Sequence, residues 1–138
     1  AASGEKNIKQ MKQLRAYSGA PIPEPLQHVS ASVWNDEDHV IQNREIYKKK
    51  YKLADQIFDD FDGYLSPEAG FFLWLDVGNG EKTALELWQT CGVQVLPGRY
   101  LSKDLNGQSP GDRFIRVAMV SELEETKVGL KKIREFLN

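Results

Sequence analysis

The sequence predicts an α/β fold of the α+β kind, in which three helices precede a small three-stranded sheet that further helices cover. Three observations predict it. The first half of the chain carries apolar residues at helical spacing. The second half carries three short apolar runs that glycine or proline bounds, as is typical of strands. Helical patterns follow the first and the last of these runs, so the expected order of elements is α-α-α-β-α-β-β-α.

Size and composition favour a globular protein with a core. The chain has 138 residues, of which 41% are hydrophobic and 28% are charged. With 18 lysines and arginines against 20 aspartates and glutamates, the net charge of −2 argues against binding to nucleic acid or to an anionic membrane. Cys91 is the one cysteine, which excludes an intrachain disulfide and a multi-thiol metal site. We see no signal segment and no membrane-spanning run, and expect a cytoplasmic location.

Two amphipathic helices are expected first. Ile8, Met11 and Leu14 lie three apart within Glu5–Tyr17, which indicates one helical face. This helix should end before a proline-dense loop, because proline removes a backbone donor. A second helix is expected over Pro25–Trp34.

A long third helix should open at Asn35–Asp38, whose acidic and amide side chains can cap the helix and match its dipole. Its apolar residues lie three, four or seven apart and form one stripe: Val40, Tyr47, Tyr51, Ala54, Phe58 and Phe61. Four of its lysines spread around the helix, and we interpret them as a solvated face rather than a phosphate site: Lys48, Lys49, Lys50 and Lys52.

The rest of the chain predicts the sheet and its covering helices. Strands are expected over Phe71–Val77, Val93–Leu96 and Phe114–Val120, and a helix over Glu81–Cys91. The last helix should begin with a capping box and bury a run of four apolar residues. The capping box is Ser121 and Glu124, and the apolar residues are Leu123, Leu130, Ile133 and Leu137.

One arginine is unusual for its position. Arg116 lies in the middle of an apolar strand, where a cation is costly to desolvate unless it meets an anion. A guanidinium offers two parallel donors that match a carboxylate, so Arg116 is a candidate for holding a carboxylic acid. An edge-strand arginine that faces solvent is the equal alternative. The loop that precedes this strand carries Arg99, Tyr100 and Lys103, which could reach a ligand or could belong to a plain solvated connector. His28 and His39 are too isolated to indicate a metal site.

Three segments together resemble the C-terminal portion of class I/II pyridoxal-phosphate-dependent aminotransferases, which have fold type I. They are Pro67–Leu75, Gly92–Gly98 and Phe114–Ala118, in the family's order and approximate spacing. Upstream, Leu14–Gln27 resembles the stretch that follows the cofactor-lysine region, and Asp38–Tyr47 resembles the long interdomain helix. The resemblance covers essentially all of this chain but only the last third or so of a full family member.

The resemblance implies a domain organisation and a role for two arginines. Residues 1–35 would be lead-in helices and a proline-rich loop from the large domain, and residues 36–138 the small C-terminal domain. Arg116 would hold the substrate α-carboxylate. Arg15 loosely matches an arginine that reads a distal carboxylate across the dimer, and an ordinary helix-end residue is the alternative. The Ser18–Pro25 loop would lie at the dimer interface.

The resemblance also implies pyridoxal 5′-phosphate as cofactor, an amino acid and a 2-oxo acid as substrates, and a homodimer. The Schiff-base lysine and the residues that bind the cofactor lie upstream in the family, so no residue of this chain is expected to be catalytic or cofactor-binding. We expect a C-terminal fragment, one that starts at Ala1 rather than at methionine and is inactive alone.

The run Leu96–Ser102 looks most like enzymes of lysine biosynthesis that act on N-succinyl-diaminopimelate, and aspartate aminotransferases are the near alternative. A pyridoxal-phosphate lyase or synthase of the same fold, or a non-catalytic structural or regulatory module, are the alternatives from other classes.

Overall fold

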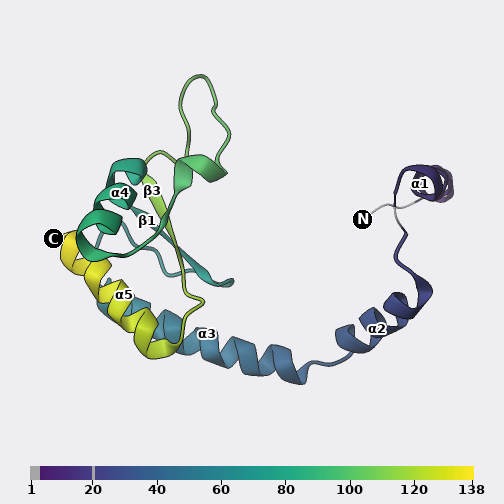
Figure 1. The fold of residues 1–138 in the computed structure, drawn as a ribbon, viewed down its shortest axis with the longest axis horizontal. Coiled ribbons are helices and arrows are strands. Elements are labelled where there is room, and N and C mark those ends of the chain that lie inside the picture. Colours follow the sequence, from purple (N-terminus) through teal and green to yellow (C-terminus); the bar gives the residue numbers. More distant parts are fainter. Residues whose placement is uncertain (1–3, 20) are drawn as a thin grey trace. The chain divides into compact units, whose positions relative to one another are not determined.

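The computed structural model describes residues 4–19 and 21–138 and divides into two compact units, residues 1–41 and 42–138. The expected start at Ala1 and one position of the Ser18–Pro25 loop, Ala20, lie outside the described residues. Figure 1 shows the elements along the chain. Each unit is described by itself.

The first unit consists of helices that bury nothing. Helix α1 (Glu5–Ser18) and helix α2 (Glu24–Trp34) contain no buried residue. Proline at the N-terminus of α2 fits the first helical turn, where its missing N–H costs no hydrogen bond. Helix α3 (Asp38–Ile57) begins in this unit and continues into the second. Both N-terminal helices therefore form as the periodicity predicts, but their apolar side chains stay exposed.

The second unit is built on a three-stranded antiparallel sheet with the order β1-β3-β2. Strand β1 (Phe72–Asp76) pairs with the central strand β3 (Phe114–Ala118) over their full lengths. Strand β2 (Leu96–Pro97) pairs with the other side of β3 through two residues. The predicted small three-stranded sheet is thus confirmed.

Three helices cover one face of this sheet. They are the second half of α3, helix α4 (Gly80–Cys91) and helix α5 (Leu123–Phe136). A short 3₁₀ helix, η1 (Gly98–Leu101), follows β2. Alternate strand residues point into a single apolar core, which the helices complete. Its buried members are Ala54, Phe58, Leu73, Leu75, Ala84, Leu87, Ile115, Val117, Met119, Leu130 and Ile133.

Local chemistry fixes the ends of the helices. The side chain of Asn79 accepts a hydrogen bond from the Lys82 N–H at 3.0 Å and caps α4. Gly92 ends α4 with a φ of 66°, a left-handed conformation that glycine adopts without a Cβ clash. No helix in the described part of the chain is long enough and apolar enough to cross a membrane.

The capping box predicted for the last helix is wrong. Helix α5 starts one residue later than expected, with Glu122 at the N-cap and no side-chain capping bond, so Glu124 lies at N2 rather than N3. The backbone oxygen of Ser121 instead accepts a hydrogen bond from the Thr126 hydroxyl at 3.0 Å. Of the expected inner face, Leu130 and Ile133 are buried, Leu137 packs at the border of the core, and Leu123 is 37% exposed.

The bounds of all three strands differ from the prediction. Strand β1 covers Phe72–Asp76 rather than Phe71–Val77, β2 covers Leu96–Pro97 rather than Val93–Leu96, and β3 ends at Ala118 rather than Val120. Residues 92–94 lie outside the strands, and together with residues 117–119 and α5 they line a hollow of about 620 Å³.

Candidate functional site

Arg116 lies at the centre of the sheet, on the face opposite the core. Its neighbours Ile115 and Val117 are buried among the core residues, so the alternation of strand side chains puts Arg116 on the other face. In the register, Arg116 is opposite Trp74 of β1 and Leu96 of β2. Because β3 is the central strand, the edge position in the alternative interpretation is wrong, whereas Arg116 does lie on the face that points away from the core.

The surroundings of Arg116 are aromatic. Its guanidinium carbon, Cζ, lies 4.1 Å from the ring centroid of Phe72. Trp74 and Phe114 share this face by strand alternation, with ring centroids 6.3 Å apart and an edge-to-face geometry. Arg116 is half-buried, and in the described part of the chain no carboxylate forms an ion pair with it. A guanidinium that stacks by its face keeps its N–H edge for an anion.

Three other arginines of the second unit are already paired with carboxylates. Arg113 donates through Nε to Asp76 Oδ2 at 3.0 Å, and Arg134 donates through Nη2 to Asp60 Oδ1 at 2.7 Å. Arg99 is the third, and its partners lie in the loop described next. Arg116 therefore differs from its neighbours in chemistry as well as in position.

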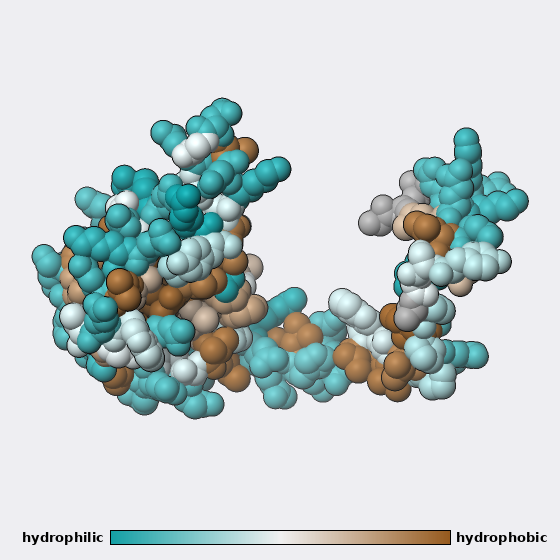
Figure 2. All heavy atoms as spheres, turned by 45° about the horizontal axis from the view of Figure 1, so that its top comes forward, coloured by the Kyte–Doolittle hydropathy of each residue, from teal (hydrophilic) through white to brown (hydrophobic). Residues whose placement is uncertain are grey.

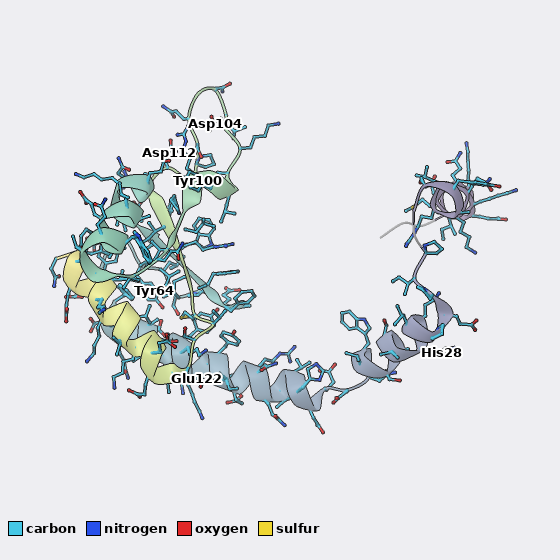
Figure 3. The ribbon with its side chains drawn as sticks, in the orientation of Figure 1. His28, Tyr64, Tyr100, Asp104, Asp112 and Glu122 are labelled. Atoms are coloured by element: carbon cyan, nitrogen blue, oxygen red, sulfur yellow. The ribbon has the colours of Figure 1, made fainter. Side chains whose placement is uncertain are left out.

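The loop between β2 and β3 is held by contacts within itself and with helix α4; Figure 3 labels Tyr100, Asp104 and Asp112 in this region. Arg99 donates to Asp112 Oδ1 at 2.7 Å and lies 3.7 Å from Asp104 Oδ2, while the Tyr100 hydroxyl donates to Glu81 Oε1 at 2.9 Å. The hydrogen bond and charge of Asp112 raise the pKa of Arg99, and the hydrogen bond to Glu81 raises the pKa of Tyr100. Of the three side chains expected to reach a ligand, Arg99 thus pairs within the loop and Tyr100 bonds to helix α4.

Two glycines allow the ends of this loop to meet. A Cβ on Gly98 would lie 2.6 Å from the Gly111 oxygen, and a Cβ on Gly111 would lie 2.3 Å from the Gly98 oxygen. The close backbone approach therefore depends on the absence of a side chain at both positions. Lys103 lies between them and is exposed.

The interpretation of the four lysines of α3 as a solvated face is wrong for Lys50. It is 4% exposed, and its Nζ donates to the Met119 backbone oxygen at 2.8 Å. The neighbouring Lys48, Lys49 and Lys52 are exposed, as predicted. A signal for Lys50 was present in the sequence, since it follows Tyr47 by three residues and precedes Ala54 by four, which places it on the apolar stripe.

The remaining candidates belong to the first unit. Arg15 lies exposed in the last turn of α1, in the other unit. His28 lies 3.8 Å from Glu24 and His39 lies 3.5 Å from Asp36, which are local contacts on helix surfaces. Within residues 4–19 and 21–138, no group of three or more histidines, cysteines, aspartates or glutamates could hold a metal ion.

Comparison with known proteins places this geometry in a known fold. No family model matches the chain. The solved structure of an aminotransferase from Neisseria meningitidis Z2491 is 32% identical, with a TM-score of 0.90 over 99% of this chain and 35% of that protein. The aminotransferase AspB from Helicobacter pylori 26695 is 30% identical, with a TM-score of 0.78 over 94% of this chain and 33% of that protein.

A curated relative points the same way. The chain is 23% identical over 115 residues to the 4-dedimethylamino-4-oxo-anhydrotetracycline transaminase OxyQ of Streptomyces rimosus, which covers 83% of this chain and 30% of that protein. The chain thus spans about a third of the length of the proteins that it matches. In fold and in sequence it corresponds to the C-terminal part of pyridoxal-phosphate-dependent aminotransferases, and the resemblance expected from the sequence is confirmed.

The described residues do not by themselves fit pyridoxal phosphate. The cofactor needs a lysine amine for its imine and donors for its phosphate. Lys50 is the one buried lysine among the described residues, and its amine already donates to a backbone carbonyl. On the face of the sheet opposite the core, this chain carries a half-buried guanidinium that has no carboxylate partner among the described residues.

Proposed function

We propose that this chain is the C-terminal part of an aminotransferase that moves an amino group between an amino acid and a 2-oxo acid, and that Arg116 holds the substrate carboxylate. The observation that carries the proposal is the Arg116 guanidinium, which stacks on Phe72 with no carboxylate partner in the described chain. A carboxylate that binds there gains a bidentate, charge-assisted pair on a partly desolvated face.

The cofactor belongs to the rest of the enzyme in this proposal. Bound pyridoxal 5′-phosphate supplies the electron sink for amino transfer. Its lysine and phosphate contacts come from residues outside this chain, so the fragment is inactive alone. The complete enzyme is a cytoplasmic homodimer, and Arg15 reads the distal carboxylate of the substrate.

The first unit supports the proposal of a missing large domain. Its helices expose apolar side chains at helical spacing, and Figure 2 shows hydrophobic atoms at the surface of α1 and α2. The exposed residues include Ile8, Met11, Leu14, Leu26, Val29 and Val33. Exposed stripes of this kind are expected to be covered by other protein. The matched aminotransferases are about three times as long as this chain, which leaves ample sequence to cover them. We assign residues 1–35 to the large domain and residues 36–138 to the small domain.

The proposed substrates come from the resemblance of one segment of this sequence to aminotransferases of known substrate class. The run Leu96–Ser102 favours N-succinyl-diaminopimelate as amino donor, with glutamate or aspartate as the near alternatives. All three carry an α-carboxylate, so Arg116 serves each of them. Turnover of the complete enzyme on each donor separates them, and turnover of none would exclude this substrate class.

Arg116→Ala in the complete enzyme is the test. A lost charge pair costs about 2–5 kcal/mol, so kcat/KM should fall roughly thirty- to five-thousandfold. Arg113→Ala is the matched control, because Arg113 neighbours β3 but already pairs with Asp76. Unchanged kinetics for Arg116→Ala would remove Arg116 from the site. Elimination products in place of a 2-oxo acid would instead indicate a lyase, and a complete chain without bound-cofactor absorbance would indicate a structural module.

A further inference from the structure

A line of aromatic rings joins helix α3 to Arg116. The ring centroids of Tyr47 and Phe71 lie 6.1 Å apart, and those of Phe71 and Phe72 lie 4.1 Å apart. Arg116 Cζ lies 4.1 Å from the Phe72 centroid at one end of this line. At the other end, Lys50 Nζ lies 4.9 Å from the Tyr47 centroid. The three rings therefore stand between two cations.

Lys50 also holds the backbone at the end of β3. Its buried Nζ donates to the Met119 oxygen, and the Met119 N–H donates to the Phe71 oxygen at 2.9 Å. Lys50 is thus linked, through one residue, to the backbone of Phe71 and to the strand that carries Arg116. Among the described residues no carboxylate pairs with Lys50, so its charge is balanced only by the carbonyl and the ring face.

The place of the Arg116 guanidinium depends on this arrangement. Its partner ring belongs to Phe72 of β1. In the strand register Arg116 is opposite Trp74, and Phe72, two residues before Trp74, is opposite Ala118. A bidentate carboxylate contact requires the guanidinium to be held within about 0.5 Å of its productive position. Phe72 cannot shift without its neighbour Phe71, which contacts Tyr47 through its ring and Met119 through its backbone.

We propose that Lys50 and Tyr47 are positioning residues for Arg116. They fix the rings and the strand end against which the guanidinium stacks, and so set where the substrate carboxylate docks. The proposal rests on the proposed function, because its readout is the binding of that carboxylate. Neither residue touches substrate in it, and no proton or electron is transferred.

The effect should be on substrate binding. Lys50→Met keeps the length and apolar stem of the side chain but removes the donor, so KM for the amino acid should rise about tenfold while kcat changes little. Lys50→Arg restores a donor and should recover most of the loss. Lys49→Met is the matched control, because Lys49 is the exposed neighbour of Lys50 and has no part in the ring contacts.

A second pair of variants tests the positioning role independently if Lys50→Met does not fold. Tyr47→Leu removes a ring from the line and should raise KM in the same way, whereas Tyr47→Phe keeps the ring and should retain the KM of the wild type. Thermal unfolding of each variant distinguishes loss of the folded structure from displacement of the Arg116 guanidinium in a folded enzyme.

The deciding experiment is a double-mutant cycle in the complete enzyme, with steady-state kinetics on the amino donor. If Lys50 acts through Arg116, Lys50→Met adds less than twofold to the loss already caused by Arg116→Ala. A multiplicative loss in the double variant, or a fall in kcat at unchanged KM for Lys50→Met, would overturn the positioning role. If Arg116→Ala alone changes nothing, the proposed function itself fails, and the positioning role fails with it.

Discussion

The two units of this chain contain similar helices but bury very different amounts of side chain. Helices α1 and α2 carry apolar residues at regular spacing, yet neither buries a single residue. In the second unit, the same kind of spacing on α4 and α5 meets a sheet, and residues such as Leu87, Leu130 and Ile133 become almost fully buried. Periodicity therefore produces a helix in both places, but it produces a packed core only where a second apolar surface is present in the same unit.

The two units also differ in how far apart in sequence the partners of these ion pairs lie. In the first unit, the pairs of His28 with Glu24 and His39 with Asp36 link residues of one helix or helix start. In the second unit, Arg134 reaches Asp60 and Arg113 reaches Asp76, which are far apart in sequence. Long-range pairs depend on the folded unit, so they report on its integrity in a way that local pairs do not.

The largest expected effect comes from a matched pair of leucines, one in each unit. Leu87→Ala removes a fully buried side chain and should lower the free energy of unfolding by about 2–5 kcal/mol. Leu26→Ala removes a side chain that is 54% exposed and should change it by no more than about 0.5 kcal/mol. Urea unfolding of the 138-residue chain measures both. Equal losses would show that α2 is packed in this chain, contrary to the comparison.

A glycine pair gives the next largest effect. Gly111→Ala should destabilise the chain by about 1–3 kcal/mol, because its Cβ would lie 2.3 Å from the Gly98 oxygen and from the Ser102 hydroxyl. In the first unit, a Cβ on Gly19 would have the Arg15 oxygen as its nearest neighbour at 3.6 Å, so Gly19→Ala should be neutral within about 0.5 kcal/mol. A neutral Gly111→Ala would show that the two ends of the loop separate freely.

Tyrosine hydroxyls should give smaller effects that depend on their partners. The Tyr64 hydroxyl donates to Asp55 Oδ1 at 2.6 Å, so Tyr64→Phe should cost about 1 kcal/mol. The buried Tyr51 hydroxyl has no hydrogen-bond partner among the described residues, so Tyr51→Phe should leave stability unchanged or raise it by up to about 1 kcal/mol. Tyr17→Phe is the control, because Tyr17 is 84% exposed in the first unit. Thermal unfolding ranks the three, and a loss for Tyr51→Phe as large as that for Tyr64→Phe would contradict this account.

The smallest expected effect is a change in acid stability. The hydrogen bond from Arg134 lowers the pKa of the Asp60 carboxyl in the folded chain. Its contribution is therefore present above the ordinary carboxyl pKa of about 4 and is lost as the pH falls through the lowered folded value. Asp60→Asn should flatten the acid limb of the stability profile, measured as Tm between about pH 5 and pH 2. Glu24→Gln, which breaks a local pair in the first unit, should leave that limb unchanged, and an equal change in both variants would contradict the distinction.

The sequence predicts the elements of the fold well, because each depends on local patterns. The run Phe71–Val77 became β1 (Phe72–Asp76), and Gly92 ended its helix in the left-handed conformation that its position indicated. The start of α5 was predicted one residue early, since an N-cap depends on the backbone angles of the preceding turn as well as on a motif.

The site was only half predictable. Arg116 stood out because a cation in an apolar strand is unusual. Its partner ring could not be identified, because the register of β1 against β3 is set across a helix, a strand and a loop rather than by a short turn. The place of Lys50 on the apolar stripe of α3 indicated its burial, but its partner could not be identified, because the Met119 oxygen lies 69 residues away in sequence. Contacts of that kind follow from the packing of the whole unit.

The central claim is that the Arg116 guanidinium receives the carboxylate of the substrate. Binding of glutarate, a dicarboxylate with no amino group to transfer, tests it most directly when its inhibition constant is measured in the complete enzyme with and without Arg116→Ala. We predict an inhibition constant that rises roughly thirty- to five-thousandfold in the variant, while Arg113→Ala leaves it unchanged. An inhibition constant equal in the wild type and in Arg116→Ala would contradict the claim.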